Sequence, residues 1–90
     1  MPEVNIPIEW PGNVADSIYS PSTVIKDYFK PGDEFTPADF ETKVTQALNL
    51  ASERVYQRFG YECTSAMSEL ERLKSKIQTL TRFDEVIKIL

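Results

Sequence analysis

The stretch from Phe35 to Leu80 most limits what this chain of 90 residues can fold into. Apolar residues recur along it at steps of three and four, in one stripe from Phe40 to Phe59 and in a second stripe after Gly60. This spacing is typical of amphipathic helices that bury one face. Glycine is favoured at the left-handed position that ends a helix. The pattern therefore predicts two long helices, joined by a tight turn at Gly60, that pack on each other as an αα-hairpin.

Several signals mark the start of the first long helix. Thr36 is a good N-cap, because its hydroxyl can accept a hydrogen bond from a free N–H of the first turn. Pro37 follows at the first helical position, where its missing N–H costs nothing. Asp39 completes an acidic variant of the capping box. Together these residues predict that the helix begins directly after Thr36.

The residues before the long helices predict a β-hairpin. Residues 4–10 alternate apolar and polar side chains, which indicates a half-buried strand. Pro7 cannot donate to a ladder, so one side of this strand is expected to be open or bulged near it. Residues 11–13 read Pro-Gly-Asn and signal a turn. Residues 14–19 are then predicted to return as the second strand.

Two further elements flank the αα-hairpin. A short helix is predicted over residues 21–29, with Ser20 as its cap and Pro31-Gly32 at its end. Apolar and β-branched residues over 85–90 predict a third strand, which we expect beside the first strand, with a parallel or an antiparallel direction left open. The predicted fold is α+β, with one domain over residues 1–90 and a three-stranded sheet covered by helices on one face.

Composition narrows the classes of function. The formal net charge of −4 argues against nucleic acid as the main partner, because phosphate contacts need a basic face. The sequence shows neither a long apolar run, as a membrane span would need, nor a basic, apolar leader, as secretion would need. A cytoplasmic location is therefore expected. With one cysteine the chain cannot form an internal disulfide. With no histidine it lacks the commonest general base and the commonest metal ligand. We therefore expect no enzyme activity, no cofactor and no metal.

Two kinds of residue could still carry chemistry. Cys63 could be a reactive thiolate near a helix start, but its place on the apolar stripe favours a buried core residue. Pairs of carboxylates could bind a divalent cation, but none lies in a ligand-loop pattern, so solvated surface is favoured. These pairs are Asp33/Glu34, Glu69/Glu71 and Asp84/Glu85.

The alternative function is the binding of a small molecule or an anion. Hydroxyls and free N–H groups are expected together at the start of the short helix, in Ser20, Ser22 and Thr23. Arg54 and Arg58 lie one helical turn apart and could clamp an anionic group. Plain helix capping and a solvated helix end are the simpler interpretations. The anion site requires that the hydroxyls and the arginines converge in space.

The second strand and the outer face of the sheet, rather than the helices, are the expected contact surface for a protein partner or for a second copy of the chain. Residues 14–19 contain no proline and no lysine, and Asp16 is their one charge, so this sheet edge has little protection against pairing. We predict that Ser17, Ile18 and Tyr19 belong to this surface. Ile18→Lys would then abolish association, provided that the side chain faces outward.

Short motifs along nearly the whole chain resemble one known family. They are Trp10-Pro11, Tyr19-Ser20-Pro21-Ser22, Lys26-Asp27-Tyr28, Pro31-Gly32, Ala38-Asp39-Phe40, Ala51-Ser52-Glu53-Arg54-Val55 and Cys63-Thr64-Ser65-Ala66. In this order they resemble the small nitrogen-starvation-response proteins that are encoded beside a nitrilase, a radical-SAM protein and an acetyltransferase in bacterial gene clusters. The resemblance implies a cytoplasmic protein linked to nitrogen limitation, and it supplies no catalytic residues. With the missing catalytic groups, it favours an accessory protein that binds a product of its gene cluster.

Overall fold

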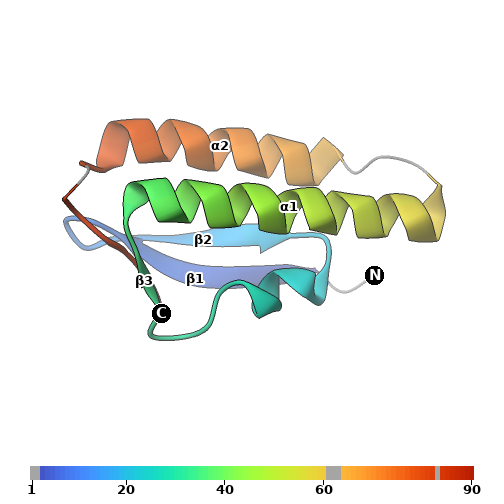
Figure 1. The fold of residues 1–90 in the computed structure, drawn as a ribbon, viewed down its shortest axis with the longest axis horizontal. Coiled ribbons are helices and arrows are strands. Elements are labelled where there is room, and N and C mark those ends of the chain that lie inside the picture. Colours follow the sequence, from blue (N-terminus) through green and yellow to red (C-terminus); the bar gives the residue numbers. More distant parts are fainter. Residues whose placement is uncertain (1–2, 61–63, 83) are drawn as a thin grey trace.

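In the computed structural model, which describes residues 3–60, 64–82 and 84–90, helices cover one face of a four-stranded sheet (Figure 1). The strands are β1 (Val4–Trp10), β2 (Val14–Ser20), β3 (Glu34–Phe35) and β4 (Ile87–Ile89). The helices are the 3-10 helix η1 (Thr23–Asp27) and the α-helices α1 (Pro37–Phe59) and α2 (Thr64–Leu80). All strand pairs are antiparallel, in the order β2-β1-β4-β3. The α+β class is confirmed, with four strands in place of three.

β1 and β2 form the predicted β-hairpin. Their register runs from Val4 opposite Ser20 to Trp10 opposite Val14. At the turn Gly12 has a φ of 85°, a left-handed value that favours glycine. Every second side chain of β1, beginning with Val4, is buried against the helices, while the residues between them are exposed or half-buried. The alternation in the sequence therefore identified the inner face of this strand.

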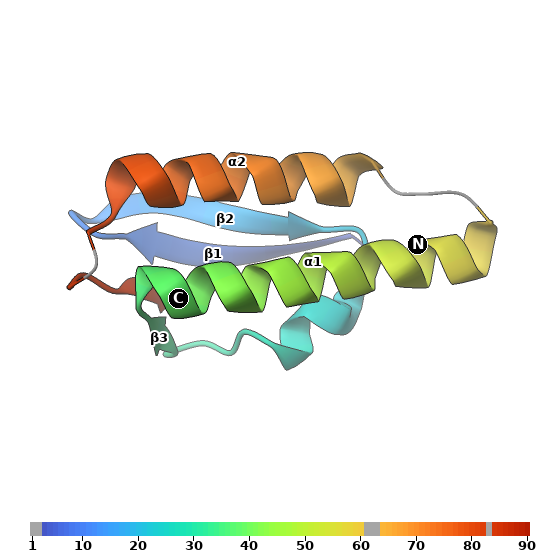
Figure 2. The same cartoon turned by 45° about the horizontal axis from the view of Figure 1, so that its top comes forward.

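β4 lies beside β1 as predicted, and it runs antiparallel to β1, a direction that the sequence pattern does not determine. Figure 2 shows that α2 finishes at the end of the sheet towards which β1 runs. A short connection from α2 must therefore turn the chain back along β1. Leu90 N–H donates to the Pro7 carbonyl at 2.9 Å, so the hydrogen bonds between the two strands extend to Pro7. Pro7 has no N–H with which to donate back to β4.

The fourth strand, β3, was not predicted. Glu34 pairs with Lys88 and Phe35 with Ile87. The pairing continues into the preceding turn, where Gly32 N–H donates to the Ile89 carbonyl at 2.8 Å. Two residues are too few to show a period in the sequence. β3 exists because β4, from the other end of the chain, supplies its partners.

The short helix differs from its prediction. It is a 3-10 helix over Thr23–Asp27 in place of residues 21–29, and Ser22 caps it in place of Ser20. Ser22 Oγ accepts the Val24 N–H at 3.3 Å. Ser20 remains in β2, paired with Val4, and so cannot start a helix. Three β-branched residues in a row, 23–25, also disfavour a longer α-helix here.

α1 begins and ends at the predicted residues. Thr36 Oγ1 accepts the Asp39 N–H at 3.2 Å, and Pro37 occupies the first turn. The capping bond contributes about 1 kcal/mol to stability. Gly60 ends the helix with a φ of 78°, and its N–H donates to the Tyr56 carbonyl at 2.7 Å. The αα-hairpin is therefore confirmed for the described residues of both helices.

The core lies between the helices and the inner face of the sheet. Four aromatic rings meet in it. The ring centroids of Trp10 and Phe40 are 5.6 Å apart in an edge-to-face contact, and those of Phe29 and Phe40 are 5.7 Å apart. Phe35 is the fourth ring, 5.5 Å from Phe29. These contacts join β1, β3 and α1 to the segment after η1.

The last turns of α1 extend past the strands (Figures 1 and 2). The predicted apolar stripe of this helix is buried from Phe40 as far as Val55. Phe59, the last member of the predicted stripe, is 46% exposed. The sheet ends before this residue and leaves it uncovered. Among the described residues no helix is long and apolar enough to cross a membrane.

Candidate functional site

A largely buried polar cluster ties α2 to β2. It consists of Asp16 on β2 with Glu69 and Arg72 on α2, and we call it the edge clasp. The Arg72 guanidinium donates to Glu69 Oε1 at 2.8 Å and to Asp16 Oδ2 at 2.9 Å. It also donates to the Ser17 carbonyl at 2.7 Å, while Glu69 Oε2 accepts the Tyr19 N–H at 2.7 Å. Helix side chains thus bond directly to the backbone of a strand.

The surroundings of the edge clasp favour the charged forms of Asp16 and Arg72. Burial alone would raise the pKa of Asp16, but hydrogen bonds from Trp10, Arg72 and the Ser17 N–H outweigh it and hold the pKa below its ordinary value. The hydrogen bond to Glu69 raises the pKa of Arg72 despite the opposing effect of burial. The Glu69 and Asp16 side chains are only 10% and 19% exposed, whereas the Arg72 side chain is 37% exposed. Such charge-assisted bonds, little exposed to water, favour a fixed geometry.

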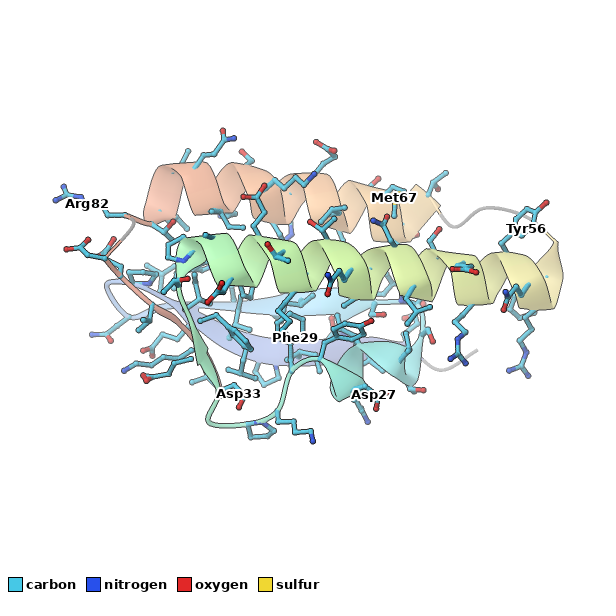
Figure 3. The ribbon with its side chains drawn as sticks, in the orientation of Figure 1. Asp27, Phe29, Asp33, Tyr56, Met67 and Arg82 are labelled. Carbon is cyan, nitrogen blue, oxygen red and sulfur yellow. The ribbon has the colours of Figure 1, made fainter. Side chains whose placement is uncertain are left out.

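Acid should weaken the edge clasp through Asp16. Because the folded-state pKa of Asp16 is below the ordinary value of 3.8, its stabilisation is present above that pH and is lost as the pH falls through the lowered value. Urea unfolding of the wild type and Asp16→Asn, measured from neutral to strongly acid pH, should therefore show a stability difference that shrinks with acid. Asp27→Asn, a change at an exposed carboxylate on η1 (Figure 3), is the control. A difference that stays constant down to the lowest pH would contradict this assignment.

The sequence interpretation missed the edge clasp. Glu69 was grouped with Glu71 as solvated surface, and for Glu69 this is wrong, because the residue is 9% exposed. A signal was present: Glu69 lies three residues after Ala66 and four before Leu73, both of which are buried on α2. A carboxylate at that spacing belongs to the buried face of the helix.

Two hydroxyl groups of the predicted anion site already form hydrogen bonds within the protein. The Ser20 side chain is fully buried, and its hydroxyl donates to the Ser22 carbonyl at 2.7 Å. The Ser22 hydroxyl caps η1 as described, and Thr23, Arg54 and Arg58 are exposed. Arg58 lies over the ring of Phe59, 5.8 Å from its centroid. In the described part of the chain no hydrogen bond or ion pair joins these serines to either arginine, so anion binding stays a prediction.

The predicted partner surface on β2 is only partly available. Ile18 is fully buried and faces the helices, so it cannot contribute to a surface of the folded protein. Ser17 and Tyr19 are half-buried, and the edge clasp occupies backbone groups of both. Cys63 lies outside the described residues. Among those residues no cluster of three or more acidic or cysteine side chains could hold a metal ion.

Exposed apolar side chains gather instead near the end of the αα-hairpin. We call Tyr56, Phe59 and Met67 the hairpin-end patch; they are 55%, 46% and 37% exposed. Figure 3 shows Tyr56 near the end of α1 and Met67 at the start of α2. A groove of about 310 Å³ lies between the helices here. Its lining residues are Asn49, Ser52, Glu53, Tyr56 and Met67.

A comparison with protein families finds one match. The family model described as nitrogen starvation-induced protein NitG matches residues 5–90. No curated protein and no solved structure matches the chain. The matched range includes the edge clasp and the hairpin-end patch, so both features belong to the part of the chain that the family model covers.

Proposed function

The chain belongs to the nitrogen starvation-induced protein NitG family, and we propose that it acts during nitrogen limitation as a non-catalytic accessory protein that binds another protein. The proposed partner is a product of the nitrilase-containing gene cluster that the family resemblance implies. A cytoplasmic location is part of this proposal. One observation carries it, which is the exposure of the three large apolar side chains of the hairpin-end patch near one another, whereas the other exposed ones, Val14, Val86 and Leu90, lie in or beside the strands.

Aromatic and methionine side chains support a binding role for this patch. Both kinds are enriched in the centre of protein interfaces, and methionine adapts its shape to a partner. Tyr56 brings a large ring that loses little conformational freedom on binding. The groove beside Met67 could receive a partner side chain. These properties favour the helices over β2 as the docking surface.

The outer face of the sheet offers less. The residues of β1 and β2 that point away from the helices are mainly small or polar, and Pro7 and Ala15 are the exposed apolar ones. The alternation places them opposite the buried set. The residues that point away from the helices are Asn5, Pro7, Glu9, Ala15, Ser17 and Tyr19. A partner that buries apolar surface gains more at the hairpin-end patch.

Binding of purified proteins tests the proposal. The chain is mixed in turn with the nitrilase, the radical-SAM protein and the acetyltransferase of the cluster, and affinity is measured by calorimetry. We expect one of them to bind, and Tyr56→Ala/Met67→Ala to weaken that binding at least about tenfold, or about 1.4 kcal/mol. The matched control is Gln46→Ala/Gln78→Ala, with one exposed residue on each helix. Failure of all three to bind, or equal loss in the control, would contradict the proposal.

A further inference from the structure

β2 is an edge strand whose outward backbone groups can be assigned from the register. Ser17 lies opposite Pro7 of β1, and the Pro7 carbonyl accepts from Leu90 on the β4 side. Pro7 therefore points away from β2, and by the alternation of an antiparallel ladder Ser17 points away from β1. The same alternation turns the N–H and C=O groups of Ala15 and Tyr19 outward. Residues 15, 17 and 19 thus form the open edge of the sheet.

The edge clasp occupies this edge. Arg72 donates to the outward carbonyl of Ser17, and Glu69 accepts the outward N–H of Tyr19, both at 2.7 Å. The Ser17 N–H donates to Asp16 Oδ1 at 2.7 Å. These are the backbone groups that an added strand would bond. Proteins often protect sheet edges with charged side chains or a covering helix, and here α2 supplies both.

We propose that the edge clasp closes a strand-pairing site on β2, and that the occupant it excludes is β2 of a second copy of this chain. Without Glu69 and Arg72, two β2 edges would pair antiparallel and extend the sheet across a dimer. The clasp then determines whether the chain associates through its sheet. This inference does not depend on the protein partner proposed above.

The sequence of β2 favours a second copy as that occupant. In an antiparallel pair with its two-fold axis at Ser17, each Ser17 faces its counterpart, and Ala15 faces Tyr19 of the other copy. All three facing pairs are then of the hydrogen-bonded type, because residues 15, 17 and 19 point outward. Asp16 would face Ile18 of the other copy, so no like charges meet. The edge is therefore complementary to itself, as a two-fold interface requires.

An apolar replacement of the clasp tests the inference. Glu69→Leu/Arg72→Met removes the bonds to β2 and replaces a mostly buried ionic network by apolar side chains, a kind of change that proteins often tolerate. Sedimentation is expected to show a doubled mass at concentrations at which the wild type is monomeric. Glu71→Leu/Lys74→Met is the matched control, since it also replaces a glutamate by leucine and a basic residue by methionine, at the same spacing on the same helix. The control variant is expected to stay monomeric.

A second substitution shows whether β2 forms the contact. Ser17→Pro, added to the clasp variant, is expected to restore the monomer, because it removes an N–H that faces away from β1 and blocks an added strand. A clasp variant that is folded, by circular dichroism and cooperative melting, but monomeric would overturn the inference. So would dimers of the control variant, or a wild-type dimer that Ser17→Pro dissociates.

Amide hydrogen exchange keeps the test independent of whether the variants fold. In the wild type, the Tyr19 and Ser17 amides are expected to exchange at least about tenfold more slowly than the Ala15 amide, which also faces outward but has no clasp residue on it. Equal exchange rates at all three amides would mean that the clasp does not hold the edge closed, and the inference would then fail.

Discussion

Replacing Phe40 by alanine should lower the free energy of unfolding by about 3–5 kcal/mol, because it removes a large ring from the centre of the core. Phe40 is fully buried. Its ring lies 5.6 Å from Trp10 and 5.7 Å from Phe29, so one residue of α1 contacts both β1 and the segment after η1. The surrounding rings are held by different elements and cannot all move into the space. Urea unfolding, followed by circular dichroism, measures the loss.

Phe59→Ala is the matched control for this prediction. It makes the same substitution on the same helix, at a residue that is 46% exposed beyond the end of the sheet. Its cost should be at most about 1.5 kcal/mol, since roughly half of this side chain already lies in water. If the two variants lost equal stability, Phe40 would not be the centre of the core.

The elements that could be predicted are those with a repeating pattern. α1 and α2 repeat their apolar residues over several turns, and β1 alternates over Val4–Trp10, so their faces followed from the sequence. The starting residue of α1 followed from the Thr36 cap and Pro37. In each of these cases the signal is local, because the residues that define the element also determine which face it buries.

The missed features depend on residues far apart in the chain. β3 consists of two residues that become a strand only beside β4. The direction of β4 depends on the end of the sheet at which α2 finishes, and the pattern over residues 85–90 does not contain that information. The sequence also could not show where the sheet ends under α1. For this reason Phe59 continued the apolar stripe in the prediction and is exposed in the structure.

The edge clasp could be predicted only in part, because it has both local signals and a contact between residues far apart in the chain. Each of its acids carried a local signal, since Glu69 shares the buried face of α2 and Asp16 alternates with Ile18 towards the helices. Two carboxylates facing a core require a cation. The identity of that cation could not be read from the sequence, because Arg72 reaches β2 only once the two elements are packed together. The protected edge therefore appeared unprotected in the sequence.

Ile18→Lys should prevent folding, which differs from the loss of association expected for an outward side chain. Ile18 is fully buried, opposite Ile6 on the inner face of the hairpin. The substitution removes about 1.5–3 kcal/mol of apolar burial. It also moves an ammonium group from water into the core, at a cost of several kcal/mol more, and the acids on this side of β2, Asp16 and Glu69, already pair with Arg72. The sum approaches the whole stability of a domain, which is about 5–15 kcal/mol.

Ala15→Lys gives the matched comparison for Ile18→Lys. Ala15 belongs to the same strand but is exposed on the opposite face, so the added side chain can stay in water. We expect this variant to keep the far-ultraviolet spectrum and the urea midpoint of the wild type, while Ile18→Lys shows the spectrum of an unfolded chain. A cooperative transition of Ile18→Lys at the wild-type midpoint would mean that this face of β2 is turned to solvent. The register that defines both the core and the closed sheet edge would then be shifted by one residue, because such a shift moves every side chain of a strand to the other face.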